Sequence, residues 1–242
     1  MGILRKFDIN YPVHVISRVV EERKIFDNDE DCLRFIFQIY AANVGRPAHN
    51  LWRQDIIKVA QSLLNGEEIS SRFVIKEHEP LVHFLDFSLV VNHNHFYLLA
   101  NQEKNIPIFM QKLNGGFAMF INLKYGRKGA LFGSRYKSII TETQFQADAV
   151  SRYISVINPL DVFQPRWREE GLKNPKEAFE FLKNYQFSSF PDKIGERSSK
   201  ILASPEILEK YLTIGSDIKT YQEFVEEFLR ERSNFSHEFF LE

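Results

Sequence analysis

The amino-acid sequence predicts an α+β protein from three observations. Residues 11–20 and 90–99 are short apolar runs with polar groups at alternating positions, a pattern typical of strands. Residues 106–123 and 141–157 carry apolar side chains at helical spacing. The chain of 242 residues is 44% hydrophobic and contains 23 Phe residues, so it can bury a large aromatic core. This length fits one large domain, or a core domain with an extension.

The first strand leads into a capped helix. Residues 11–20 alternate and are rich in β-branched side chains, which favours a strand. The run at 27–30 then offers capping side chains and negative charge for a helix N-terminus, and an apolar stripe follows it. We expect this helix to end between residues 43 and 47. The segment from about 45 to 80 is interpreted as an insertion with an amphipathic helix at 52–64.

Two histidines share one face of the strand at 90–99. Successive side chains of a strand point to opposite faces, so His93, His95 and Tyr97 lie on the same side. Neutral imidazoles about 6 to 7 Å apart along one strand face can hold a divalent cation, provided that a further ligand comes from elsewhere. A half-buried strand whose histidines are only hydrogen bonded explains the pattern equally well. The alternation alone does not choose between these two interpretations.

Two further helices follow this strand. The helix at 106–123 has two adjacent glycines in its middle, which weaken it. Thr141 or Thr143 can cap a third helix, which an Asn-Pro pair stops just after residue 157. Tyr153 on this helix has apolar neighbours at helical spacing, so spacing alone favours a core tyrosine over a functional one.

A basic segment connects these two helices. Residues 124–138 include three glycines, five cations and three aromatic rings. DNA phosphates can take the charges and unpaired bases can stack on the rings, although a solvated basic loop has the same composition. The net charge of -1 gives no global attraction for nucleic acid, so any such surface has to be local. The candidate DNA-binding residues are Lys124, Arg127, Lys128, Arg135, Tyr136 and Lys137, together with Arg152 on the third helix.

The composition also bears on the compartment. The single cysteine, Cys32, leaves no partner for an intramolecular disulfide and no cysteine-based zinc site, which suits a reducing cytoplasm. No stretch approaches the roughly 20 apolar residues of a membrane span, and the first residues lack the apolar core of a signal peptide. We therefore expect a cytoplasmic protein with no membrane partner.

Four short motifs occur in the order in which one family has them. Residues 94–99 are similar to a strand of the form Asn-His-hydrophobic-His-Leu-Leu, and residues 109–114 read Phe-Met-Gln-Lys-Leu-Asn. Residues 129–138 read Gly-X-Leu-Phe-X-X-Arg-Tyr-Lys-Ser, and residues 151–159 are similar to Arg-Tyr-Ile-His-Leu-Asn-Pro. These motifs resemble the single-tyrosine HUH transposases of the insertion-sequence-200-like and REP-associated kind. Residues 188–190 also resemble a tail segment of REP-associated members.

The chain departs from the family pattern in two places. Tyr97 stands where the family has its second histidine, and His93, on the same strand face, stands where a proline is common. One residue is added before the Asn-Pro pair, so the residue four positions after Tyr153 is Ile157 and Asn158 is displaced to the fifth. The resemblance therefore leaves open whether the altered motif still binds a metal.

The resemblance implies a fold and a division of the chain. The fold would be a ferredoxin-like HUH endonuclease core, an antiparallel sheet with helices on one face, elaborated by an inserted helix and a helical extension. Residues 1–162 would form the transposase-like domain, with the insertion at about 45–80. Residues 163–242 would form the helical extension packed on this core. Relatives often act as homodimers, which nothing in the sequence itself establishes.

The resemblance also implies a reaction. Tyr153 would be the catalytic residue of a metal-dependent cleavage and transfer of single-stranded or hairpin DNA, through a 5'-phosphotyrosine, in DNA transposition or recombination. His95 and His93 would hold magnesium or manganese, and Tyr97 and Asn158 are candidates for polar assistance. Two alternatives stay open: a domesticated protein that binds hairpin DNA without cutting it, and a protein-interaction scaffold with no affinity for DNA.

Overall fold

The central sheet joins strands that are far apart in the chain. The computed structural model describes residues 5–47, 50–133, 135–213 and 218–233. The sheet order is β4-β5-β1-β6, and every neighbouring pair is antiparallel. With a helix after β1 and another after β5, this is the expected ferredoxin-like order, and the α+β class is confirmed. The elements are β1 (Val13–Arg18), α1 (Asp29–Val44), β4 (Val82–Val90), β5 (His93–Ala100), α3 (Asn105–Lys124) and β6 (Lys137–Ile140).

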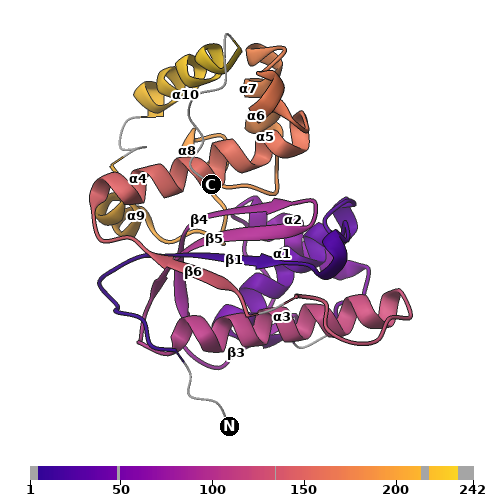
Figure 1. Cartoon of the computed structure of the whole chain (residues 1–242). Coiled ribbons are helices and arrows are strands. Elements are labelled where there is room, and N and C mark those ends of the chain that lie inside the picture. Colours follow the sequence, from indigo (N-terminus) through magenta and orange to yellow (C-terminus); the bar gives the residue numbers. More distant parts are fainter. Residues whose placement is uncertain (1–4, 48–49, 134, 214–217, 234–242) are drawn as a thin grey trace.

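Helices cover both faces of this sheet (Figure 1). α1 and α3 lie on one face, and a long helix lies across the other. This second layer consists of α4 (Gln144–Arg152), a π-helical turn η2 (Tyr153–Ile157) and α5 (Asn158–Phe163). The expectation of helices on one face is thus corrected. The physical reason is that β4 and β5 are buried along almost their whole length, which requires cover on both sides.

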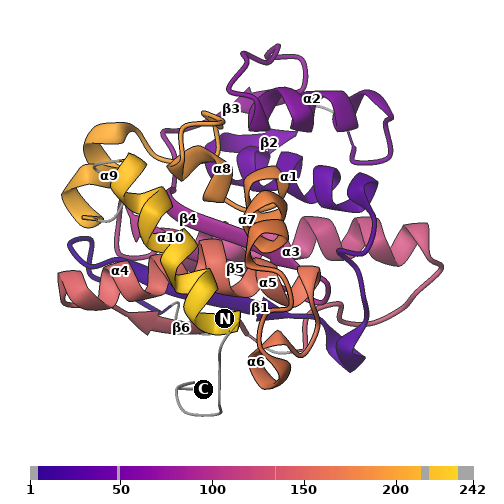
Figure 2. The ribbon, with the colours of Figure 1, turned by 90° about the horizontal axis from the view of Figure 1, so that it is seen from above.

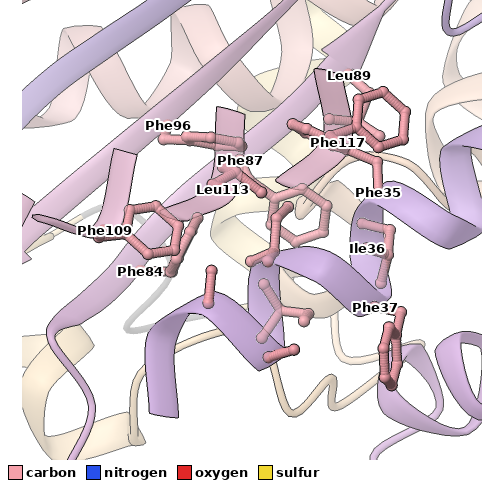
Figure 3. Packing of buried hydrophobic residues seen from close by; sticks show 14 of the residues in the cluster. Phe35, Ile36, Phe37, Phe84, Phe87, Leu89, Phe96, Phe109, Leu113 and Phe117 are labelled. Atoms are coloured by element: carbon pink, nitrogen blue, oxygen red, sulfur yellow. The ribbon is translucent and has the colours of Figure 1, made fainter. Parts of the chain in front are cut away.

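Phenylalanines fill the space between the sheet and helices α1 and α3 (Figure 3). The ring centroid of Phe35 lies 4.7 Å from that of Phe117, and the ring centroid of Phe84 lies 5.2 Å from that of Phe96. All four side chains are fully buried. Edge-to-face contacts of this kind add to the stabilisation from apolar burial. The aromatic core that the composition predicted is present.

The stretch at residues 90–99 is not one strand but the junction of two. Val90 closes β4, Val91 and Asn92 form a turn, and β5 begins at His93. A two-residue turn inside an apolar run leaves no gap in the hydrophobic pattern, so the alternation did not reveal it. The correction does not change the predicted faces, because both histidines lie within β5.

The first helix and the insertion follow the sequence pattern closely. The side chain of Asn28 accepts a hydrogen bond from the backbone N–H of Asp31 at 3.0 Å and caps α1. The insertion contains the expected helix, which packs on α1 through its apolar face. Its elements are β2 (Gly45–Pro47), α2 (Asp55–Leu64) and β3 (Val74–Lys76), and β2 pairs with β3.

The tyrosine helix, which runs through α4, η2 and α5 without a break, widens in its middle. The backbone N–H of Asn158 donates to the carbonyl of Tyr153, five residues earlier, which defines a π-helical turn. Pro159 has no N–H to offer the carbonyl four residues before it, and its ring crowds that carbonyl in a regular helix, so a wider turn relieves the clash. The helix then continues as α5, which corrects the prediction that it ends at Asn158-Pro159.

The helices after α5 pack over the helix formed by α4, η2 and α5 (Figure 2). Their apolar side chains, including Trp167 and Leu182, form a second core with Val156 and Leu160 of the tyrosine helix. None of the described helices is both long and apolar enough to cross a lipid bilayer. The remaining elements are η1 (Val20–Glu22), α6 (Trp167–Glu170), α7 (Pro175–Asn184), α8 (Phe190–Lys193), α9 (Pro205–Tyr211) and α10 (Ile218–Ser233).

The two glycines in α3 should respond differently to substitution. A Cβ at Gly115 would meet no atom within 4 Å, whereas one at Gly116 would lie 2.3 Å from the side-chain nitrogen of Gln38. Gly115→Ala should therefore stabilise the fold by about 0.5–1 kcal/mol, because it removes the entropic cost of a mid-helix glycine. Gly116→Ala should gain less or destabilise. Urea unfolding of the two variants checks this, and an equal gain at both positions would contradict the packing of Gln38.

Candidate functional site

Three imidazoles come together on the sheet face that the tyrosine helix covers. His93 and His95 stand at alternate positions of β5, as the sequence pattern predicted, and their ring centroids are 4.9 Å apart. His14 of β1 reaches His95 from the neighbouring strand. Its Nε2 lies 2.9 Å from Nδ1 of His95, so one nitrogen donates a hydrogen bond and the other accepts it. The sequence pattern did not identify His14 as part of this cluster.

Burial keeps these imidazoles neutral. His14 and His95 are 5% and 3% exposed. Burial lowers the pKa of His14 to about 4, and burial together with the charge of Arg18 lowers the pKa of His93 to about 4. Burial, followed by the neighbouring imidazoles, holds the pKa of His95 well below its ordinary value. At neutral pH each ring therefore keeps a nitrogen lone pair that can accept a hydrogen bond or bind a metal.

The buried ring of His14 should make the fold sensitive to mild acid. Its pKa is about 4 in the folded protein and near 6.5 in an unfolded chain, so the folded state binds fewer protons between these values. The free energy of unfolding is therefore not reduced by protonation of His14 above pH 6.5. It decreases as the pH falls toward 4, by up to about 3 kcal/mol. The unfolding free energy of His14→Gln, measured in urea, should change less over this range than that of the wild-type protein.

A matched control separates this effect from general acid denaturation. His78 is exposed, so His78→Gln should keep the wild-type dependence of unfolding free energy on pH. Equal slopes in all three proteins would contradict the assignment to His14.

Tyr153 lies against the imidazole cluster. Its ring centroid is 5.7 Å from that of His95 and 6.1 Å from that of His14, both edge to face. The side chain is half-buried, so it is neither sealed in the core nor held out in solvent. The crossing of the helix over the sheet, which spacing could not reveal, decides this position. A phenol and neutral imidazoles are thereby brought into ring contact with one another.

Three buried polar atoms on this side of the sheet have no hydrogen-bond partner: His95 Nε2, Ser88 Oγ and Asn158 Nδ2. Ser88 stands opposite His95 in the sheet, and Asn158 lies on the helix that covers this face. The π turn places Asn158 one turn beyond Tyr153, which absorbs the residue added before the Asn-Pro pair. Buried polar atoms without partners are typical of places where a water molecule or an ion belongs.

These residues fit a divalent cation, but with few ligands of their own. His93 uses Nδ1 for the side-chain oxygen of Asn92 at 2.6 Å, which leaves its Nε2 available as a ligand on a ring whose centroid is 4.9 Å from that of His95. The amide of Asn158 can turn to present its oxygen. Among the described residues, no group of three or more His, Cys, Asp or Glu side chains can hold a metal ion. A cation here would take its other ligands from water and substrate oxygens, as Mg²⁺ commonly does.

Tyr97 is a core residue. Its side chain is fully buried, packs with Leu85 and Ile154, and shares a hydrogen bond with the hydroxyl of Thr141. Burial raises the pKa of Tyr97 to about 12, so the phenol stays protonated. The structure does not open this hydroxyl to a substrate, and polar assistance from Tyr97 therefore finds no support in its position.

Two arginines and an aspartate border the cluster, and none of them was predicted. Arg18 ends β1 directly opposite His93 and is exposed. Arg168 of α6 lies over the ring of Tyr153, with its guanidinium carbon 5.7 Å from the ring centroid. Asp161 accepts two hydrogen bonds from Arg168, at 3.0 and 2.8 Å. No sequence motif marks these residues, because only tertiary packing brings their elements to the site.

The predicted DNA contacts fall into two groups. Lys124 forms an ion pair with the buried Asp31 at 2.7 Å, whereas Arg127 donates to Asn122 of α3 at 3.3 Å, so both hold the start of the basic segment against the helices. Arg152 does not belong to the basic segment, and its guanidinium packs on a phenylalanine ring of α10. Lys128, Arg135 and Lys137 are exposed, and Tyr136 is half-buried.

The basic segment passes the end of β1 that pairs with His93. The backbone N–H of Gly133 donates to the carbonyl of Arg18 at 3.1 Å, and that of Val20 donates to the carbonyl of Leu131 at 2.9 Å. Since Arg18 pairs with His93 in the sheet, this segment runs beside the histidine end of the cluster.

Comparisons with known proteins leave the function to be argued from this geometry. No model of a protein family matches the sequence, and no curated protein matches it. Among solved structures, the chain is similar to a REP-associated tyrosine transposase bound to a REP hairpin. The identity is 12%, the TM-score is 0.46, and the match covers 84% of this chain and 92% of that one. A similarity of this size establishes neither a family nor a function.

Proposed function

We propose that this protein is a transposase-like enzyme that cleaves and rejoins single-stranded DNA, with Tyr153 as the nucleophile. The observation that carries the proposal is the half-buried phenol packed 5.7 Å, ring to ring, from the buried imidazole of His95. The motifs around these residues support the same assignment, because they resemble those that carry the tyrosine and first histidine of HUH transposases.

The reaction is a transesterification at phosphorus. The phenol oxygen of Tyr153 forms a bond to the phosphorus while the bond from phosphorus to the 3'-oxygen breaks, which yields a 5'-phosphotyrosine and a free 3'-hydroxyl. The phenol proton passes to solvent, which the half-buried side chain can reach, and the leaving oxygen takes up a proton. Attack by another 3'-hydroxyl reverses the reaction and joins strands without ATP, because the covalent link conserves the phosphodiester energy.

Magnesium or manganese is the proposed cofactor, held by His95 and His93 with help from Asn158. When bound, the cation would neutralise charge on a non-bridging oxygen of the scissile phosphate. The surrounding residues orient the imidazoles and keep them able to bind a cation. His14 bonds to Nδ1 of His95 and thereby fixes the orientation of that ring, and burial keeps the imidazoles unprotonated.

The proposed substrate is single-stranded DNA next to a hairpin, since Tyr153 needs a backbone freed from its complement. The exposed side chains of Lys128, Arg135 and Lys137 would bind phosphates along the segment that passes the site. A homodimer stays a prediction.

A covalent adduct tests this function. Purified protein is mixed with manganese and a pool of hairpin oligonucleotides with randomised single-stranded flanks, then denatured in detergent. A label at the 3' end should migrate with the protein, whereas a label at the 5' end should leave with the released 3'-hydroxyl strand. A 5' label on the protein would mean the opposite polarity, and the absence of any adduct would contradict the proposal.

Removing the proposed metal or its ligands should slow adduct formation. We expect EDTA to suppress the adduct, and His95→Ala and His93→Ala each to lower its rate by at least about 10- to 100-fold, the loss that removal of a group supporting a metal ligand already causes. His78→Ala changes an exposed histidine outside the cluster and should leave the rate unchanged. If His95→Ala is impaired and His93→Ala is not, His93 is not a ligand.

A second candidate function is recognition of hairpin DNA without cleavage, as in a domesticated relative. The observation that favours it is the full burial of Tyr97, which occupies the position of the second family histidine. This alternative predicts salt-sensitive binding to hairpins but no adduct with any of them. A protein-interaction scaffold would show no salt-sensitive affinity for DNA at all.

A further inference from the structure

The C-terminal extension places a guanidinium against the tyrosine helix. The guanidinium carbon of Arg168 lies 5.7 Å from the ring centroid of Tyr153 and 5.5 Å from that of Trp167. The side chain of Arg168 is only 28% exposed. A guanidinium stacked on aromatic faces is held in orientation, while the N–H groups on its edge can still bind other partners.

Asp161 fixes the orientation of this guanidinium. Its carboxylate accepts from Nε and from a terminal nitrogen of Arg168 at 3.0 and 2.8 Å, and also from the indole N–H of Trp167 at 2.8 Å. Burial by itself would lower the pKa of Arg168, but the hydrogen bond and charge of Asp161, together with those of Tyr153, outweigh it and raise the pKa. Arg168 therefore keeps its positive charge, and its two hydrogen bonds to Asp161 fix the orientation of the guanidinium.

The charge of Arg168 reaches the imidazole cluster. It acts on both His93 and His95, as does the charge of Arg18 at the end of β1. Arg168 thus lies against Tyr153 and acts on the imidazoles, and Arg18 acts on the same imidazoles from the end of β1. This is the arrangement expected where a phosphate is bound, because planar guanidinium groups match the oxygens of a phosphate.

We propose that Arg168 is a positioning residue for Tyr153: it holds the phenol over the imidazoles and directs positive charge at the phosphate that the phenol attacks. The extension thereby completes the site in addition to packing on the core. This inference rests on the proposed function, in which Tyr153 is the nucleophile. A fixed guanidinium stabilises the negative charge that develops on phosphorus oxygens without having to rearrange during the reaction.

Rates of adduct formation test the chemical part of this inference. Arg168→Ala should lower the rate constant by about 100-fold, while the Kd for the hairpin changes by no more than roughly threefold. Arg168→Lys should recover part of the rate, because it keeps the charge but loses the planar fork. Arg166→Ala is the matched control, since Arg166 lies two residues away, is 71% exposed and pairs with Glu170. It should behave as the wild-type protein.

A second readout needs no DNA. With 3-fluorotyrosine at position 153, the ¹⁹F resonance should move in Arg168→Ala and in Arg168→Gln, return toward its original position in Arg168→Lys, and stay in place in Arg166→Ala. Arg168→Gln keeps a side chain that can bond to Asp161, so it guards against simple loosening of α6. An unmoved resonance in both Arg168→Ala and Arg168→Gln overturns the inference.

The two readouts also separate this inference from the proposed function. A moved resonance with wild-type rates in Arg168→Ala overturns the inference and leaves the nucleophile assignment standing. If the wild-type protein forms no adduct, the proposed function fails, and the resonance alone decides whether Arg168 holds Tyr153.

Discussion

Replacing Tyr153 by Phe should abolish the covalent adduct, with a loss of more than about 1,000-fold in rate, because the variant lacks the only atom that can attack phosphorus from this helix position. The ring remains, so its contacts with His14, His95 and Arg168 can persist. Affinity for the hairpin should therefore stay close to that of the wild-type protein. Detergent-resistant transfer of a 3'-labelled oligonucleotide measures the first quantity, and fluorescence anisotropy measures the second.

Tyr97→Phe is the matched control for this experiment. It removes a second phenol on the same face of the sheet, whose hydroxyl is bonded to Thr141 in the interior. Loss of that bond should cost about 1 kcal/mol of stability and leave adduct formation intact. The opposite result, an adduct lost with Tyr97→Phe and kept with Tyr153→Phe, would make Tyr97 the nucleophile.

Replacing Lys193 by Met should have the largest effect on stability. Its ammonium is paired with the fully buried carboxylate of Asp86 and is itself only 8% exposed. Ser151 and Ser189 donate to the same carboxylate, so the pair joins β4, the tyrosine helix and α8. Removing one partner strands a charge in the interior, which costs about 3–5 kcal/mol. Urea unfolding at pH 7 measures the loss.

The stability that Lys193→Met loses should depend on pH. Burial raises the pKa of Asp86 and the charge of Lys193 opposes this rise, so the carboxyl should hold a proton more readily in folded Lys193→Met than in an unfolded chain. The folded variant then gains protons relative to the unfolded chain as the pH falls. The difference in unfolding free energy between the wild-type protein and Lys193→Met should therefore be smaller at pH 5 than at pH 7.

Two further variants show whether the buried pair is the cause. The double variant Asp86→Leu/Lys193→Met should recover most of the stability, because it leaves no unpaired charge. Lys6→Met breaks an exposed pair with Glu103 and should have little effect. A double variant as unstable as Lys193→Met alone would show that packing, and not the stranded charge, sets the cost.

Local sequence signals predicted the elements whose cause is local. The first strand, the helix capped by Asn28 and the helix at 106–123 lie within a few residues of the predicted bounds. Alternation, capping and helical spacing act over a few neighbouring residues, so they can be identified without knowing the fold. The turn at Val91-Asn92 and the π turn before Pro159 escaped notice because neither interrupts the hydrophobic pattern.

The sequence by itself determined that His93 and His95 share a strand face, and its motifs singled out Tyr153 as the residue to consider. Tertiary structure alone decided that this tyrosine packs on those imidazoles, that His14 and Arg168 join them, and that Tyr97 is buried. The physical reason is that strand register and the crossing of a helix over a sheet are set by side-chain packing between segments far apart in the chain. A local sequence pattern does not predict contacts between such distant segments.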